Sequence, residues 1–219
     1  YAKTEPELGA NYNVSRTSVR EAMRVLSAKG LIEIRQKVGT RVQEPEHWNI
    51  FDSDILRWHH EEGRGDAVML DLIELRQILE PAAAKLAANR ANMDQHRSLK
   101  AAIQTMQDQL DSPEDFARAD LDFHLAVYEA SQNSFLLQFG SVVSDFLRRV
   151  FMIQQQAVRG REALELDVQL HNEVYEAINR GDGQLAADTM LTVVLEGKNS
   201  LIEALKSGAN SNDLNRRGE

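Results

Sequence analysis

The sequence predicts a mainly α-helical protein that begins with a small basic unit carrying the strand-like segments of the chain. Three observations lead to this prediction. Helical hydrophobic periodicity runs through almost all of residues 66–206, strand-like patterns lie between residues 31 and 42, and no β-rich run follows them. A chain of 219 residues suits one or two domains and can bury a sizeable core.

The basic unit, residues 1–43, has the pattern of two helices followed by a two-stranded wing. Lys3 to Tyr12 fits a single helix. Ser15 is suited to cap the next helix, which has an apolar stripe at three- and four-residue spacing. The stripe consists of Val19, Ala22, Met23 and Leu26. Gly30 ends this helix, and residues 31–42 form two strands around a turn. A winged helix-turn-helix normally has one further helix, so we expect this unit to be truncated at its first helix.

Charge is divided unevenly along the chain. The net charge is −9, but residues 1–43 carry +4, so the remaining residues carry −13. Such a division indicates nucleic-acid contact by the basic part. The polar residues at the start of the second helix that lie off its apolar stripe are Arg16, Thr17, Ser18, Arg20 and Arg24. A helix with donors at its N-terminal end, followed by a basic hairpin, suits the major groove and its flanking phosphates. The alternative is a basic helix face that is merely solvated.

Residues 44–66 mark a boundary. Ile55, Leu56 and Trp58 indicate a short docked helix there rather than a loose linker. Beyond it the periodicity predicts six helices, near residues 66–90, 93–111, 113–131, 134–157, 161–180 and 183–206. Residues 67–208 would then form an all-helical domain, and residues 209–219 a polar tail.

Several ionisable residues of the helical part lie on apolar stripes. Asp120 and His124 are four residues apart and share one helix face, and His171 heads an apolar stripe of its own. A carboxylate on such a face must be paired or ligated, because burying it bare is very costly. The residues expected to line an anion or metal pocket are Arg76, Asp120, His124, Arg148 and His171. The alternatives are satisfied core histidines, a simple Asp–His hydrogen bond and a buried ion-pair network.

Composition excludes several classes of protein. Without Cys the chain has neither a disulfide framework nor thiolate chemistry, which is typical of a reducing cytoplasm. The sequence shows no charged-then-apolar leader and no apolar run near the roughly 18 residues needed to span a bilayer. We therefore expect a cytoplasmic protein that has no membrane partner.

Two sets of motifs resemble those of known families. The run VSRTSVREA from Val14, with LSAKGLI from Leu26, resembles the winged helix of GntR-type bacterial transcription regulators. The second set resembles the all-helical FCD ligand-binding domain of the FadR subfamily. It consists of ELR from Glu74, EPAA from Glu80, ADLDFH from Ala119, SQN from Ser131, and His171. The match covers nearly the whole chain in the right order.

The first resemblance implies a homodimer that binds a palindromic operator and responds to a small metabolite, usually a carboxylate. It assigns DNA contacts to the recognition helix at Arg16, Thr17, Ser18 and Arg20, and to the wing at Lys37, Gly39 and Thr40.

The second resemblance implies a divalent-metal site, for zinc or a similar ion. Asp120, His124 and His171 match three of its four usual ligands, and Val193 stands at the fourth position. Three ligands leave room for a weaker divalent ion or for direct anion binding. Arg76 matches the arginine that pairs with the carboxylate of the effector. Residues 48–58 further resemble galactonate-responsive repressors, which implies an aldonate or related sugar acid as effector.

Together these patterns predict a metabolite-responsive transcription regulator, most simply a repressor, rather than an enzyme. One alternative is a helical-bundle, metal-dependent hydrolase that uses the Asp/His/His group. Such hydrolysis needs a general base nearby, and the motifs offer none. A second alternative is a scaffold whose winged unit binds protein instead of DNA. Steep salt dependence of binding to duplex DNA would distinguish these.

Overall fold

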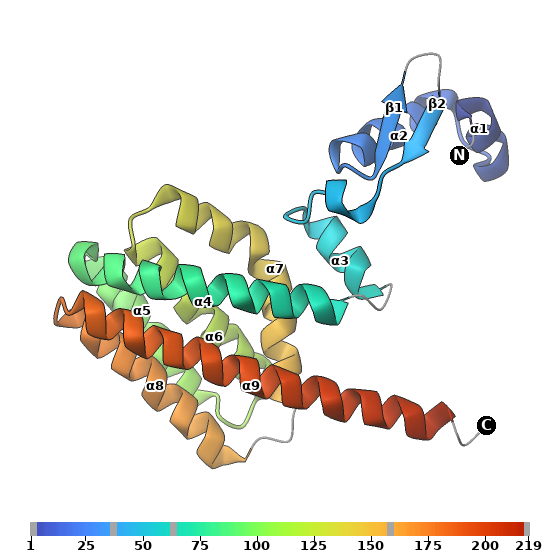
Figure 1. Ribbon diagram of the computed structural model, residues 1–219. Helices are drawn as coiled ribbons and strands as arrows, with labels where there is room; N and C mark the ends of the chain where they lie inside the picture. Colours follow the sequence, from blue (N-terminus) through green and yellow to red (C-terminus); the bar gives the residue numbers. More distant parts are fainter. Residues whose placement is uncertain (1–3, 36–38, 62–64, 157–159, 217–219) are drawn as a thin grey trace. The chain divides into compact units, whose positions relative to one another are not determined.

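The computed structural model describes residues 4–35, 39–61, 65–156 and 160–216. Its internal contacts divide the chain into two units, residues 1–59 and residues 60–219 (Figure 1). The smaller unit contains α1 (Glu5–Tyr12), α2 (Arg16–Ala28), β1 (Ile32–Arg35), β2 (Gly39–Val42), the 3-10 helix η1 (Pro45–His47) and most of α3 (Ser53–Glu61). The sequence predicts a boundary segment at residues 44–66, and the contacts place the division within that range, after His59.

Helix α2 forms where the sequence predicts a recognition helix. The Ser15 side chain accepts a hydrogen bond from the Ser18 backbone N–H (3.1 Å), which satisfies one of the donors left free at a helix start. The buried residues of its apolar stripe, Val19 and Met23, form a small core with Ile32. This core fixes α2 against β1 and leaves the polar face of the helix outside.

The wing is an antiparallel pair of short strands. Ile32 lies opposite Val42, and Arg35 lies opposite Gly39. At the junction between α2 and β1, Gly30 has a φ of +76°, and a Cβ atom there would lie 2.2 Å from the carbonyl oxygen of His47. Only glycine fits, because the backbone must take a left-handed conformation while the connector passes directly over it.

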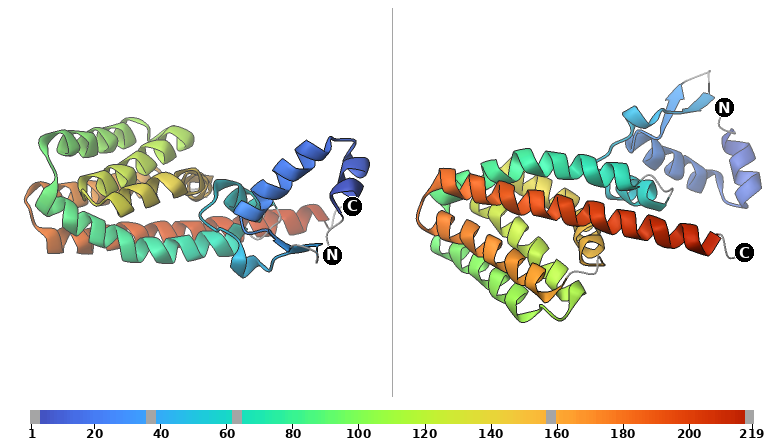
Figure 2. Two further views of the ribbon diagram at one scale, coloured as in Figure 1. Left: turned by 90° about the horizontal axis from the view of Figure 1, so that it is seen from above. Right: turned by 60° about the horizontal axis from the view of Figure 1, so that its bottom comes forward.

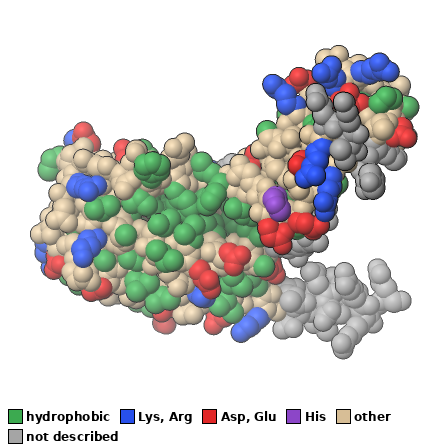
Figure 3. Space-filling view, turned by 45° about the horizontal axis from the view of Figure 1, so that its top comes forward, with side chains coloured by type: hydrophobic (Ala, Val, Ile, Leu, Met, Phe, Trp, Pro, Cys, Tyr) green, Lys and Arg blue, Asp and Glu red, His purple; other side chains and the backbone are tan. Residues whose placement is uncertain are grey.

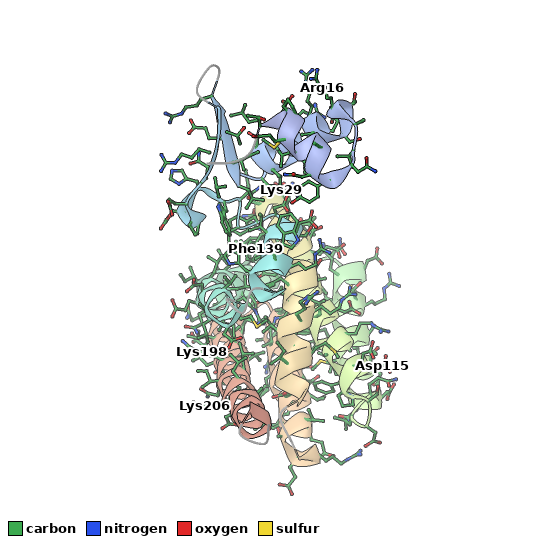
Figure 4. All side chains as sticks on the ribbon, turned by 90° about the vertical axis from the view of Figure 1, so that its right-hand side faces the viewer. Arg16, Lys29, Asp115, Phe139, Lys198 and Lys206 are labelled. Carbon is green, nitrogen blue, oxygen red and sulfur yellow. The ribbon has the colours of Figure 1, made fainter. Side chains whose placement is uncertain are left out.

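The connector, residues 44–59, packs onto the winged helix. The Asn49 N–H donates to the Lys29 carbonyl oxygen (2.9 Å). The Lys29 ammonium contacts the Asp52 carboxylate at 2.7 Å and the Asp54 carboxylate at 2.9 Å. Figure 4 labels Lys29 at the end of α2, beside this segment. The expected docked helix is therefore present as α3, and it is fastened to the C-terminal end of the recognition helix.

The larger unit is a bundle of six helices in the described residues. They are α4 (Gly65–Arg90), α5 (Met93–Asp108), α6 (Pro113–Ala130), α7 (Ser134–Gln156), α8 (Arg161–Asn179) and α9 (Gly183–Arg216). Helices α4 and α9 run side by side in opposite directions, and α8 lies along α9 (Figures 1 and 2). Helix α6 contacts α4, α5 and α7, and most of its residues are buried. Side chains of α6 therefore meet those of its neighbours in the interior of the bundle.

The predicted helix ends agree with the structure within a few residues, except at the C-terminal end. There the sequence predicts a helix that ends near residue 206, just before Gly208, but α9 continues to Arg216. The prediction was wrong because a single glycine costs a helix only about 1 kcal/mol, which does not by itself end it. None of the described helices is long and apolar enough to cross a membrane.

Candidate functional site

The start of α2 presents its polar side chains to solvent. Arg16, Thr17, Ser18 and Arg20 are all exposed, and Arg16 points away from the small unit (Figure 4). The N-terminal end of a helix also offers free N–H groups and a partial positive charge, which favour a phosphate. This end of α2 therefore has the chemistry required of a DNA-contacting surface.

The wing residues of the sequence prediction lie only partly within the described chain. Gly39 is exposed at the first position of β2, with a φ of +107°, and Thr40 follows it half-buried. Lys37 lies outside the described residues. The two described residues stand on the hairpin that follows the recognition helix, at the end where the strands turn.

A second feature lies inside the larger unit, where five ionisable side chains meet. We call this group the buried polar cluster; it consists of Arg76 and Glu80 from α4, Asp120 and His124 from α6, and His171 from α8. None of the five is more than 6% exposed. Arg76 and Glu80 are four residues apart on α4, and so are Asp120 and His124 on α6. Residues at this spacing lie on the same face of a helix, so each helix directs both of its polar residues to the cluster. Three separate helices thus deliver their polar residues to one place.

Contacts within the cluster are short and continuous. Arg76 Nε donates to Glu80 Oε1 (2.7 Å), and Glu80 Oε2 lies 2.8 Å from His124 Nδ1. Asp120 Oδ1 lies 3.3 Å from His124 Nε2 and 3.1 Å from His171 Nε2. The Arg76 guanidinium also rests on the ring of Phe151, 4.7 Å from its centroid. Every charged group therefore has a partner of opposite charge or an aromatic face.

These contacts shift the pKa values of the cluster. Burial alone would raise the pKa of Glu80, but the Arg76 and His124 charges outweigh it and lower the pKa to about 2. Burial would likewise raise the pKa of Asp120, but hydrogen bonds from His124 and His171 hold it below its ordinary value. For His124, burial would lower the pKa, whereas the Glu80 charge raises it. Both carboxylates are thus ionised near neutral pH.

The donor set fits a divalent cation. The ligand atoms of Asp120, His124 and His171 lie within 4.8 Å of one another. Each imidazole is oriented from behind, His124 by Glu80 and His171 by the Asp167 carbonyl oxygen, 2.7 Å from its Nδ1. Each Nε2 atom faces Asp120 Oδ1, and the Arg76 guanidinium also lies 3.2 Å from His124 Nε2. An Nε2 atom in this place either donates a proton to the carboxylate or, without that proton, binds a cation. Outer partners of this kind are typical of metal-ligating histidines.

The structure also corrects the predicted set. Arg148 was expected to face inward, and this was wrong, because its side chain is exposed on α7. The inner face of α7 is taken by its apolar neighbours Leu147 and Phe151. Conversely, Glu80 was recognised only as part of a motif and not as a site residue. Its position one turn after Arg76 on the same face was the signal that could have identified it.

Val193 is buried on α9, and its side chain has no ligand atom.

A separate hollow of about 510 Å³ opens between α5, α6 and α7. It contains the carboxylates Asp122 and Glu129, and none of its lining residues is Lys or Arg. An anionic ligand would be repelled there. By its chemistry, this hollow is a poorer candidate for an acid-binding site than the buried polar cluster.

An exposed recognition helix with a wing, joined in one chain to a helical unit that encloses a polar cluster, defines a DNA-binding transcription regulator. Comparison with known proteins agrees. Residues 4–42 match the model of "Bacterial regulatory proteins, gntR family", and residues 71–195 match that of the FCD domain. The chain therefore belongs to the GntR family of bacterial regulatory proteins and carries an FCD domain.

Similar proteins point the same way. The "Galactonate operon transcriptional repressor" of Escherichia coli is 32% identical over 91% of this chain and 86% of that protein. The "HTH-type transcriptional regulator LutR" of Bacillus subtilis is 31% identical over 84% of this chain and 83% of that one. Among solved structures, a Streptococcus agalactiae GntR protein has a TM-score of 0.57 at 25% identity, over 91% and 88% of the two chains. These relatives are regulators, so the hydrolase alternative is not supported.

Proposed function

We propose that this protein is the metabolite-responsive repressor of a bacterial operon. It binds palindromic operator DNA as a homodimer, and a small sugar acid bound in its larger unit controls that binding. The observation that carries the proposal is the buried polar cluster, because a helical unit has no structural need for five ionisable groups in its interior. Such a regulator works where the DNA is, in the cytoplasm.

DNA recognition is assigned to α2 and the wing. In this proposal the recognition helix enters the major groove with Arg16, Thr17, Ser18 and Arg20 toward phosphates and base edges. Gly39 and Thr40 of the wing approach the flanking backbone, and the sequence adds Lys37 to them. The positive charge of residues 1–43 supports this assignment, since phosphate contacts dominate the affinity of such proteins for DNA.

The effector site is assigned to the buried polar cluster. Asp120, His124 and His171 would hold a divalent ion of zinc type, which supplies positive charge for an acidic effector. The apolar Val193 leaves three protein ligands, a number typical of metal sites that keep a position open for a ligand. The galactonate operon repressor among the relatives supports a sugar acid as the effector class.

Burial of the cluster supports a coupling between effector binding and shape. Arg76 is 1% exposed and His124 is 2% exposed, so a ligand can reach them only when the surrounding helices separate. A ligand that binds the opened arrangement better than the closed one shifts the population toward it. Effector binding would thus change the arrangement of the larger unit, as regulation requires.

Dimerisation is supported by apolar side chains on the surface of the larger unit. Ile78 on α4 is 69% exposed, and Phe135 on α7 is 84% exposed. Figure 3 shows hydrophobic side chains gathered over one face of this unit. Large exposed apolar patches mark interaction sites, and a second copy of the chain would match a palindromic operator.

The first experiment tests DNA binding. A duplex selected from a random library by the full chain is titrated with wild-type protein and with Arg16→Ala at several salt concentrations. Arg16→Ala should weaken binding and reduce the salt slope by about one unit. Arg97→Ala is the matched control, since Arg97 is an exposed arginine on α5, paired with Asp94. Equal affinity of Arg16→Ala and wild type would refute the assigned surface.

A second experiment tests the effector. Sugar acids are screened for their effect on the thermal unfolding of the full chain, with and without Co²⁺, and the active ones are added to the DNA titration. A ligand that binds only the folded chain raises its melting temperature. An acid that stabilises the protein and lowers its affinity for DNA supports the proposal. A panel of aldonates and uronates that changes neither quantity would refute it.

A further inference from the structure

The hollow of about 510 Å³ between α5, α6 and α7 has no part in the proposed function. Helix α6 packs against both of the other helices, and each of the three lines the hollow with residues at three- or four-residue spacing, on one face. Lining residues such as Ala101, Ala126 and Ser141 are small, which leaves the space between the helices open. The hollow therefore forms a groove along about two turns of α6. We call it the acidic groove, because Asp122 and Glu129 line it on α6.

Asp122 and Glu129 stand at the two ends of the α6 side of the groove. They are seven residues apart, which corresponds to about 10.5 Å along the helix axis. The apolar Leu125 lies between them. Among the described residues neither carboxylate belongs to an ion pair, although the Arg118 and Arg148 charges act on Asp122 from outside the groove. The α6 side of the groove thus has a negative charge at each end and an apolar middle.

The hydroxyl groups of the groove do not satisfy these two carboxylates. Three of the four, on Ser98, Thr105 and Ser144, donate instead to backbone carbonyl oxygens of their own helices, at 2.9–3.2 Å. None of the described lining residues is Lys or Arg. A ligand that fits the groove must therefore bring positively charged donors of its own, because a carboxylate forms its stronger hydrogen bonds with such groups.

A linear organic dication meets these requirements. Its two ammonium groups would contact Asp122 and Glu129, and its methylene chain would cover Leu125. Two nitrogens joined by eight chain atoms are roughly 11 Å apart in the extended form, as in spermidine and 1,8-diaminooctane. Four chain atoms, as in 1,4-diaminobutane, span only roughly 6 Å, which is too little for both carboxylates at this separation. A metal ion holds its oxygen ligands within about 2.6 Å, so a single ion cannot bridge them either.

We propose that the acidic groove binds linear polyamines, with one ammonium group at each carboxylate and the chain lying along α6. This site is distinct from the buried polar cluster, since both carboxylates are exposed and neither belongs to that cluster. Binding there requires neither a metal ion nor a sugar acid. Exposure to solvent keeps the affinity modest, and each carboxylate contributes up to about fivefold to it.

The experiment compares amines by calorimetry on the full chain without DNA, at constant ionic strength. Spermidine and 1,8-diaminooctane should each bind about fivefold more tightly than 1,4-diaminobutane. The monoamine 1-aminooctane has the same chain but one charge, so it should also bind about fivefold more weakly than 1,8-diaminooctane. Asp122→Asn and Glu129→Gln should each remove the preference for the diamine. Glu173→Gln is the matched control, since it removes an exposed negative charge on α8 outside the groove and should leave all affinities unchanged.

The chain-length comparison uses wild type alone and therefore does not depend on the folding of any variant. Equal affinity for 1,8-diaminooctane and 1,4-diaminobutane would overturn the bridging of the two carboxylates. Unchanged affinities in both Asp122→Asn and Glu129→Gln would overturn the site itself. A helical peptide with lysines seven residues apart carries the same charge spacing. If this peptide bound and no amine did, the groove would be a protein-docking surface and the proposal would be wrong.

Discussion

Replacing Lys29 with Met should loosen the connector without disturbing the larger unit. The Lys29 side chain is 15% exposed, and its ammonium contacts Asp52 at 2.7 Å and Asp54 at 2.9 Å. The Asp52 carboxylate raises the pKa of Lys29 through its hydrogen bond, so the ammonium is charged at neutral pH. Methionine keeps most of the apolar stem and removes the charge.

The magnitude follows from the exposure of the two carboxylates. Asp52 is 22% exposed, and a hydrogen bond to a charged group in such a place contributes about 1.5–3 kcal/mol. Asp54 is 41% exposed, and its pair with Lys29 contributes less than about 1 kcal/mol because solvent screens it. A loss of about 2 kcal/mol therefore opposes the docking of α3, which corresponds to about a 30-fold larger population of the undocked state.

Hydrogen exchange on the full chain measures this directly, because amide protection in α3 reports its local opening. The α3 amides of Lys29→Met should exchange about 30-fold faster than those of wild type, while amides of α6 keep their rates. Arg57→Met is the control, since Arg57 also pairs with Asp54 (2.8 Å) but is 48% exposed, and it should change the rates only slightly. Identical α3 protection in Lys29→Met and Arg57→Met would contradict the reasoning.

Three further predictions concern the backbone of the winged helix and the buried polar cluster. Gly30→Ala should destabilise the small unit by more than about 2 kcal/mol in urea unfolding, whereas Gly39→Ala, with no atom near its added methyl, should cost only backbone strain. Glu80 has a folded pKa of about 2 against an ordinary 4.5, so its contribution of about 3 kcal/mol is present above pH 4.5 and lost as the pH falls toward 2. Glu80→Gln should therefore lose less stability across that range. Asp120→Asn should weaken Co²⁺ binding more than about 100-fold, while the neighbouring, exposed Asp122→Asn should leave it unchanged.

Periodicity and caps were sufficient to predict most of the fold. Ser15 and the stripe through Val19 and Met23 placed α2, and regular spacing placed the helices of the larger unit, because these signals are local. The connector was harder to assign. Lys29 and Asp52 are 23 residues apart, and no local pattern indicates that they meet.

The sequence predicted those site residues whose spacing within a single helix indicates that they face inward. Asp120 and His124 stand four apart on an apolar face, and that spacing indicated an inward pair. Arg148 directly follows the buried Leu147 on α7. An error of one residue in assigning the buried face of this helix was therefore enough to predict an inward Arg148. Glu80 was overlooked because its importance comes from His124 and Tyr128, which lie 44 and 48 residues away on another helix.

The burial of the buried polar cluster also affects how long a bound ligand stays. In the proposed function, a ligand held by Arg76 and His124, both at most 2% exposed, would leave only during rare openings of the bundle. Each 1.4 kcal/mol of opening free energy lengthens its residence about tenfold. A promoter governed by this protein would therefore respond to the sustained presence of its metabolite, and it would stay active for some time after the supply ends.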